Sequence, residues 1–296
     1  MDRYWRTPLR VLGERLLELG VARAEICLGT ISVGAKIVTN LRPLGGIKTP
    51  GVTKAGRLSL QGVCEDRKVK VYSVLRPEQA VLRAEVQAFS GGADWAFPEI
   101  IANDGCLVVE AWVDGAPVRQ ARHTARQRAG AAVGNFISSC WRVPALTELA
   151  SRHSGAFCYF EDYLLPRLGV WRHLDVVGEF VEFWRCQYES ASLPSLLGHA
   201  DLSADNVLIE TATDRVMFID NELLGVGRGW ILDPYNSFIR SDFEVAEEGP
   251  VPVDRDFIQL SWALRKAGSA FDAGEPGRAV QLLAEALGKR REGLDR

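Results

Sequence analysis

Residues 198–222 read GHADLSADNVLIETATDRVMFIDNE, and this stretch decides the fold. Asp201 and Asn206 are five residues apart, and an apolar run follows Asn206 at once. A turn over residues 211–214 leads to a second apolar run, which ends at Asp220. Two short apolar runs joined by a polar turn predict a β-hairpin, whose strand ends face each other across the ladder. The stretch therefore predicts that Asn206 and Asp220 lie close together.

These three side chains suit one class of reaction. Phosphoryl transfer needs a carboxylate that orients an incoming hydroxyl and accepts its proton, and it needs an amide and a second carboxylate that hold magnesium on the phosphates. Asp201 can supply the first carboxylate, and Asn206 and Asp220 can supply the metal ligands. An acidic surface turn is the plain alternative, but three groups in this order on one hairpin favour the chemical interpretation.

The motif resembles that of the aminoglycoside phosphotransferase and choline kinase-like family. Its signature is His-Gly-Asp, four residues, Asn, and later Ile-Asp-x-Glu. The matching residues here are His199, Ala200, Asp201, Asn206, Ile219, Asp220, Asn221 and Glu222. The resemblance implies that Asp201 is the catalytic base and that Asn206 and Asp220 bind magnesium. It also implies supporting roles for His199, Glu222 and Asp233, the last being a further family acid.

The chain departs from the family pattern at three places. Ala200 stands where glycine is usual, and Asn221 stands where tryptophan is common. Residues 203–205 replace a His-Pro-Gly-like stretch, in the loop where the acceptor hydroxyl arrives. Because of the last departure, the family's substrates cannot simply be assigned to this chain.

The resemblance implies an α+β, bilobal protein-kinase-like fold. Residues 1–112 would form a small strand-rich N-lobe, with an N-terminal helix, a nucleotide-binding sheet and one inserted helix. Residues 113–296 would form a larger, mainly helical C-lobe that holds the catalytic hairpin and the substrate site.

Hydrophobic periodicity predicts the same arrangement from other residues. Residues 24–113 are strand-like around one helix that begins at Pro77, and Asn103-Asp104-Gly105 has the composition of a hairpin turn. From about 119 to 193, apolar residues recur every three or four positions, which is typical of helices. Helix is again expected from about Asp256 to the end of the chain, with a break at 274–276.

The resemblance also predicts a nucleotide site in the N-lobe, with a strand lysine on the α- and β-phosphates and a helix glutamate that holds this lysine. Lys68 and Lys70 compete for the first role, because both point to one face of their strand. We prefer Lys70. For the glutamate we prefer Glu85 over Glu78, since the helix dipole alone explains a carboxylate in the first turn.

Two backbone segments complete the predicted nucleotide site. A loop at Gly45 and Gly46 would cover the phosphates, although a plain hairpin turn explains these glycines equally well. Backbone groups of Ala111 and Val113 would bond the adenine base, by resemblance to the family's strand and hinge. The implied cofactors are Mg²⁺ and either ATP or GTP.

Composition limits the other possibilities. The 296 residues carry a net charge of −3, which gives no footprint for nucleic acid or an anionic membrane. The six cysteines include no Cys-x-x-Cys pair, and no apolar run reaches the length of a transmembrane helix. No targeting peptide is apparent. We therefore expect a cytoplasmic enzyme, monomeric or homodimeric, with a small-molecule partner and neither nucleic acid nor membrane.

The sequence says least about the molecule that accepts the phosphoryl group. Six acidic residues lie from Asp242 to Asp256. An acidic wall would suit a cationic antibiotic, but we slightly prefer a solvated loop as the explanation. The leading prediction is an O-phosphotransferase acting on an antibiotic, such as an aminoglycoside or another cationic natural product. A sugar, an amino alcohol or another metabolite is the alternative. A catalytically silent kinase-fold binding protein is the alternative of another class.

Overall fold

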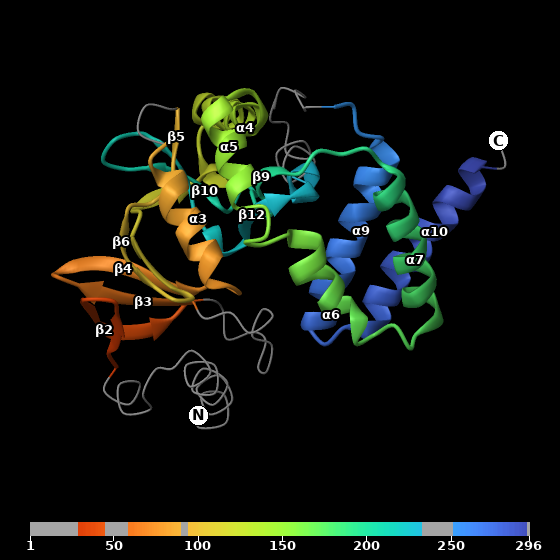
Figure 1. Ribbon diagram of the computed structural model, residues 1–296, viewed down its shortest axis with the longest axis horizontal. Helices are drawn as coiled ribbons and strands as arrows, with labels where there is room; N and C mark the ends of the chain where they lie inside the picture. The colour runs from red at the N-terminus through yellow and green to blue at the C-terminus, as the bar shows by residue number, and fades with distance from the viewer. Residues whose placement is uncertain (1–28, 45–58, 90–93, 233–250, 295–296) are drawn as a thin grey trace.

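The computed structural model describes residues 29–44, 59–89, 94–232 and 251–294. A strand-rich part lies at one end of the molecule and a helical bundle at the other, and the predicted catalytic hairpin lies between them (Figure 1). The molecule is therefore built from two parts of different composition, with the hairpin at their junction.

The strand-rich part is a six-stranded antiparallel sheet in the order β1-β2-β3-β4-β7-β6. The strands are β1 (Ile31–Val33), β2 (Lys36–Pro43), β3 (Ser59–Cys64), β4 (Arg67–Ser73), β6 (Ile100–Asp104) and β7 (Leu107–Ala111). Side chains alternate between the faces of a strand, so Val69 and Val71 enter the core on one face while Lys70 and Tyr72 point to the other. Helix α3 (Pro77–Gln87) covers this second face.

The hairpin predicted from the motif is formed by β10 (Val207–Glu210) and β11 (Val216–Phe218). The hairpin is extended into a sheet by β8 (Gly115–Pro117) beside β10 and by β5 (Trp95–Ala96) beside β11. Helices α4 (His123–Arg142) and α5 (Pro144–Arg152) share one hydrophobic cluster with this sheet, and its aromatic members are Trp95, Phe97, Phe136 and Phe218. Each strand of the hairpin is thus paired with a further strand on its outer side.

A second pair of strands stands next to the hairpin. Strand β9 (Leu196–His199) pairs with β12 (Leu224–Gly227), and His199 lies opposite Leu224. Short helical turns connect these elements: η2 (Val118–Gln120), the π-helical η3 (Tyr159–Leu164), η4 (Asn221–Leu223) and η5 (Arg228–Leu232). The pairing places His199, at the start of the motif, opposite Leu224, two residues after its end.

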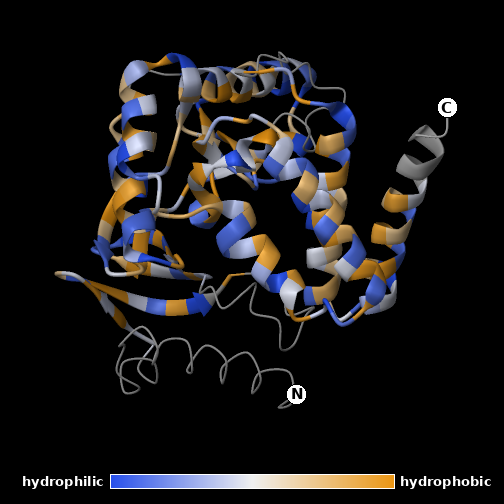
Figure 2. Ribbon diagram, turned by 45° about the vertical axis from the view of Figure 1, so that its right-hand side comes forward, coloured by the Kyte–Doolittle hydropathy of each residue, from blue (hydrophilic) through white to orange (hydrophobic). Residues whose placement is uncertain are grey.

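The helical bundle contains α6 (Leu165–Gly169), α7 (Asp175–Ser190), α9 (Arg255–Asp272) and α10 (Pro276–Leu294). Its helices carry both apolar and polar residues along their length, as Figure 2 shows. The apolar faces meet in a core that includes Trp184, Phe257 and Leu264. Asp254 caps α9 by accepting a hydrogen bond from the Asp256 N–H at 2.9 Å.

Most of the predicted elements are present. The hairpin turn predicted at 103–105 has Gly105 at φ +52°, and the predicted break in the last helices separates α9 from α10. The predicted N-terminal helix and the loop at Gly45 and Gly46 lie outside the described residues. Within the described part of the chain, no helix is both long and apolar enough to span a membrane. The division at residue 112 stays a prediction.

Candidate active site

The loop that carries Asp201 is braced by its own backbone and by Asn206. The Ser203 N–H donates to the Asp201 carbonyl at 2.8 Å, and the Asn206 N–H donates to Ser203 at 2.9 Å. The Asn206 side-chain amide donates to the Asp201 carbonyl at 2.7 Å. The nitrogen of this amide is used inside the loop, so it is the oxygen of Asn206 that can serve a metal ion.

The end of the hairpin joins this loop to Asp220. The Ile219 N–H donates to the Asn206 carbonyl at 2.9 Å. His199 is fully buried, and its Nε2–H donates to the Ile219 carbonyl at 3.1 Å. Burial lowers the pKa of His199, so the ring is neutral and suited to this bond. His199 and Asn206 therefore both bond the backbone of Ile219, the residue before Asp220.

Lys70 reaches this point from the sheet. Its Nζ lies 2.6 Å from Asp220 Oδ1 and 2.9 Å from Glu222 Oε1. Burial opposes the charge of this lysine, but the carboxylates of Glu222 and Asp220 outweigh it and raise its pKa. Lys68, the competing candidate, is exposed and lies over the Trp112 ring at 3.8 Å. The geometry therefore favours Lys70.

The predicted pairing of Lys70 with Glu85 is wrong. The carboxylate of Glu85 lies 3.0 Å from Arg152 and 3.3 Å from His153, on α5 and at its C-terminal end. The reason is the helical period: Gln79 and Arg83 are the buried polar residues of α3, and Glu85 points to another side. The rival, Glu78, is exposed.

Two residues that the sequence did not single out hold the site together. Gln79 donates from its side-chain amide to the Glu222 carbonyl at 2.7 Å and to the Leu224 carbonyl at 3.0 Å. Arg265, on α9, donates to the carboxylate of Asp201 and to the carbonyl of Ala200. Both side chains come from helices far from the motif in sequence, so no spacing could have revealed them.

The remaining predicted residues are less completely placed. The Ala111 N–H donates to the Glu99 carbonyl at 2.8 Å, so this N–H is not left for a nucleotide base. Val113 packs with Ile219 against the buried Ala96, Leu208 and Met217, which forms an apolar patch beside Asp220. Gly45, Gly46 and Asp233 lie outside the described residues. The same holds for the acidic residues between 242 and 248.

The donor set is suited to magnesium only together with a phosphate ligand. Among the described residues, no group of three or more His, Cys, Asp and Glu side chains could hold a metal ion by itself. Mg²⁺ is typically held by one or two protein carboxylates and by substrate phosphates. Asp220 and the oxygen of Asn206 therefore fit a metal that a nucleotide brings with it.

Comparison with known proteins places the fold. No protein-family model and no curated protein sequence matches this chain. Solved structures do match over nearly the whole length. LicA in complex with AMP has a TM-score of 0.53 at 13% identity, and covers 94% of this chain and 98% of its own.

Two aminoglycoside phosphotransferases match equally well. APH(2")-IIia, solved with GDP and kanamycin, has a TM-score of 0.52 at 14% identity, and covers 93% of this chain and 99% of its own. A thermostable mutant of APH(4)-Ia, in its apo form, has a TM-score of 0.51 at 14% identity, and covers 86% and 95%. The chain has the bilobal protein-kinase-like fold. The predicted fold class is confirmed, and at these identities the likeness establishes the fold alone.

Proposed function

We propose that this protein is a small-molecule kinase of the aminoglycoside phosphotransferase and choline kinase-like family, which transfers a phosphoryl group from ATP or GTP to a hydroxyl. One observation carries the proposal. Lys70 from the sheet meets Asp220 at 2.6 Å, and the residue before Asp220 is hydrogen-bonded to Asn206, which in turn bonds the Asp201 carbonyl. Side chains from three segments of the chain thus lie near one another, and they are the kinds of group that phosphoryl transfer requires.

Each group has a role that its surroundings suit. Lys70, kept charged by two carboxylates, would bind the phosphates of the nucleotide. Asn206 and Asp220 would hold Mg²⁺, which when bound neutralises charge on the phosphates. Asp201, at the start of a braced loop, would orient the acceptor hydroxyl and accept its proton. Val113 and Ile219 would offer an apolar surface to the base.

The chain offers one constraint on the acceptor. Arg265 pairs with Asp201, so a fixed positive charge lies beside the proposed base. The guanidinium compensates the negative charge of Asp201, so this carboxylate offers little net attraction to an ammonium group next to the reacting hydroxyl. We therefore expect the reacting hydroxyl on an uncharged part of the acceptor. An antibiotic, such as an aminoglycoside or another cationic natural product, meets this requirement when its charged groups are farther from the hydroxyl. So does a sugar or an amino alcohol.

The test is a screen of acceptors. The purified protein is incubated with Mg²⁺ and ATP or GTP and with aminoglycosides, macrolides, sugars or amino alcohols. Release of ADP or GDP is then measured, and the acceptor is weighed by mass spectrometry for the gain of one phosphate. Asp201→Asn is the matched control. Nucleotide release that depends on an acceptor and is lost in the control supports the proposal. Binding of nucleotide without turnover on any compound would instead indicate a binding protein with a kinase fold. The cytoplasmic location and the monomeric or homodimeric state remain predictions.

A further inference from the structure

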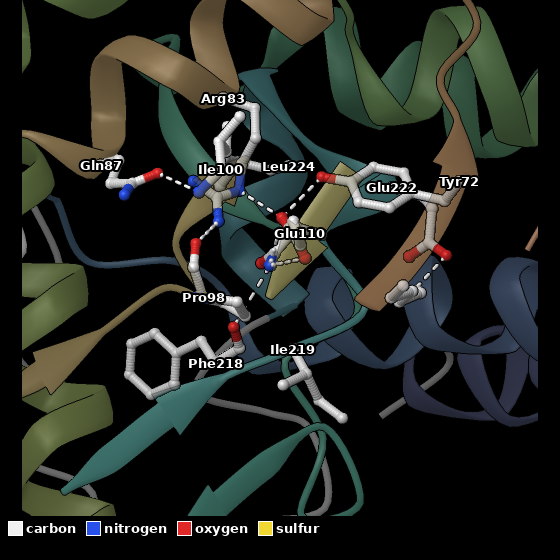
Figure 3. A network of polar contacts seen from close by, with 12 residues as sticks. Tyr72, Arg83, Gln87, Pro98, Ile100, Glu110, Phe218, Ile219, Glu222 and Leu224 are labelled. Carbon is white, nitrogen blue, oxygen red and sulfur yellow. Dashed lines mark hydrogen bonds and ion pairs between the residues drawn. The ribbon is translucent and has the colours of Figure 1, made fainter. Parts of the chain in front are cut away.

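A buried ion pair lies beside the proposed nucleotide lysine. Arg83 Nε lies 2.8 Å from Glu110 Oε1, and both side chains are 1% exposed. Removing two charges from water is costly, and such a pair persists only where further hydrogen bonds satisfy it. Here the Tyr72 hydroxyl donates to Glu110 at 2.7 Å, and Arg83 also donates to the Pro98 carbonyl at 2.6 Å. Figure 3 shows Arg83 and Tyr72 directed at the Glu110 carboxylate from two sides.

The register of the sheet places this glutamate next to Lys70. Lys70 and Glu110 are directly opposite each other on β4 and β7. Tyr72, two residues further along β4, points to the same face as Lys70. An acidic group therefore does stand beside the lysine, as the resemblance implied, but it comes from the neighbouring strand. The helix α3 supplies the arginine that neutralises it.

The network continues to the residue that follows Asp220. The Asn221 side-chain amide donates to both Glu110 oxygens, at 3.3 and 3.4 Å, and to the Phe218 carbonyl at 3.2 Å. Asn221 is 1% exposed. Between Phe218 and Asn221 the chain must turn sharply, and Asp220 adopts φ +59° and ψ +47° there. This left-handed conformation costs an aspartate more than a glycine, although aspartate adopts it more readily than most residues, and contacts around the turn help to hold it.

We propose that Glu110 and Asn221 form a positioning clamp, in which Asn221 ties the turn that carries Asp220 to the strand opposite Lys70. The clamp keeps the carboxylate of Asp220, the proposed metal ligand, beside Lys70, the proposed phosphate ligand. Asn221 occupies the position where tryptophan is common in the family, and its amide makes the bonds to Glu110. This inference rests on the proposed function, because it assigns the clamp to the magnesium end of the nucleotide site.

The test is the magnesium dependence of nucleotide binding in Asn221→Ala. This change removes the amide and leaves Glu110 with its bonds from Arg83 and Tyr72. We expect the Kd of ATP, measured by calorimetry at saturating Mg²⁺, to rise about tenfold, while the Kd of ATP in EDTA stays within twofold of the wild-type value. Asn135→Ala is the control, since it removes an amide-to-carboxylate bond, to Asp94, on the surface. It should bind like wild type in both conditions.

A second variant tests the clamp in case Asn221→Ala does not fold. Tyr72→Phe removes one bond to Glu110 and keeps the ring, and it should weaken binding with Mg²⁺ in the same direction by about two- to fivefold. Tyr188→Phe, which removes a tyrosine–glutamate bond in the helical bundle, is its control. Unchanged binding in Asn221→Ala together with a lower Tm would overturn the clamp, as would equal weakening with and without Mg²⁺. Asp220→Ala is titrated in parallel. If it keeps full magnesium-dependent binding, the proposed function fails and not only the clamp.

Discussion

Replacing Lys70 with methionine tests the ion pairs that join the sheet to the end of the hairpin. The Lys70 side chain is 11% exposed and that of Glu222 is 9%, whereas that of Asp220 is 41%. Breaking a buried ion pair by removing one partner typically costs about 3–5 kcal/mol. The contact with the more exposed Asp220 adds at most about 1 kcal/mol. The lysine is itself removed, which relieves its own desolvation, so the lower end of the range applies.

We therefore expect Lys70→Met to lower the free energy of unfolding by about 3 kcal/mol, and the Tm by roughly 6–12 °C for a chain of this size. Adding Glu222→Gln should recover part of this loss, because the second change removes the carboxylate left unpaired. The double-mutant cycle between residues 70 and 222 should give a coupling of about 0.5–3 kcal/mol. Thermal and urea unfolding of the metal-free protein measure these values without any substrate.

Lys68→Met is the matched control for this experiment. Lys68 is exposed, and its removal should change the stability by no more than about 0.5 kcal/mol and leave nucleotide affinity unchanged. Lys70→Met should weaken ATP binding at least tenfold in calorimetry. Coupling of residue 70 with Glu85, together with additive effects at 70 and 222, would refute the placement of Lys70.

Four further changes examine the site. Asp201→Asn should lower kcat by roughly 10²–10⁴-fold with the acceptor found in the screen, and it should leave ATP affinity nearly unchanged. Arg265→Met should lower kcat by less than Asp201→Asn does, since a residue that positions a base cannot contribute more than the base itself. An equal or larger loss would show another role for the arginine. Glu85→Gln should leave nucleotide affinity unchanged and cost at most about 1 kcal/mol of stability, because its partners are partly exposed. Weaker ATP binding in this variant would show that Glu85 does contribute to the nucleotide site. Burial lowers the pKa of His199, so the unfolded chain binds a proton more readily than the folded one. Stability should therefore fall as the pH drops below about 6.5, by up to about 1.4 kcal/mol per pH unit, and His199→Gln should remove this component in urea unfolding at pH 5–8.

The hairpin could be predicted because its signals are local. Two apolar runs separated by a turn lie between Asn206 and Asp220. Strand pairing alone brings the ends of these runs together. Period two places Lys70 on one face of β4, but it places Lys68 on the same face, so the preference for Lys70 rested on the resemblance. The hairpin ends needed no knowledge of distant contacts.

The partners of these residues could not be predicted in the same way. Glu85 is mid-helix among apolar residues, and a small rotation of α3 decides whether 79 and 83 or 85 face the sheet. The placement of Glu110 opposite Lys70 depends on the pairing of β4 with β7, which the sequence does not fix. Arg265 reaches Asp201 only because the helical bundle packs against the loop. Tertiary packing determines each of these contacts.

Calorimetric titration of the wild-type protein and of Asp220→Ala with ATP, in Mg²⁺ and in EDTA, is the decisive measurement. The wild-type protein should bind ATP, or GTP in its place, more tightly with Mg²⁺ than without it. Asp220→Ala should lose this difference, because the carboxylate beside Lys70 is the proposed metal ligand. Absence of binding for both nucleotides, or an affinity that depends neither on Mg²⁺ nor on Asp220, would contradict the assignment of this site as a kinase centre.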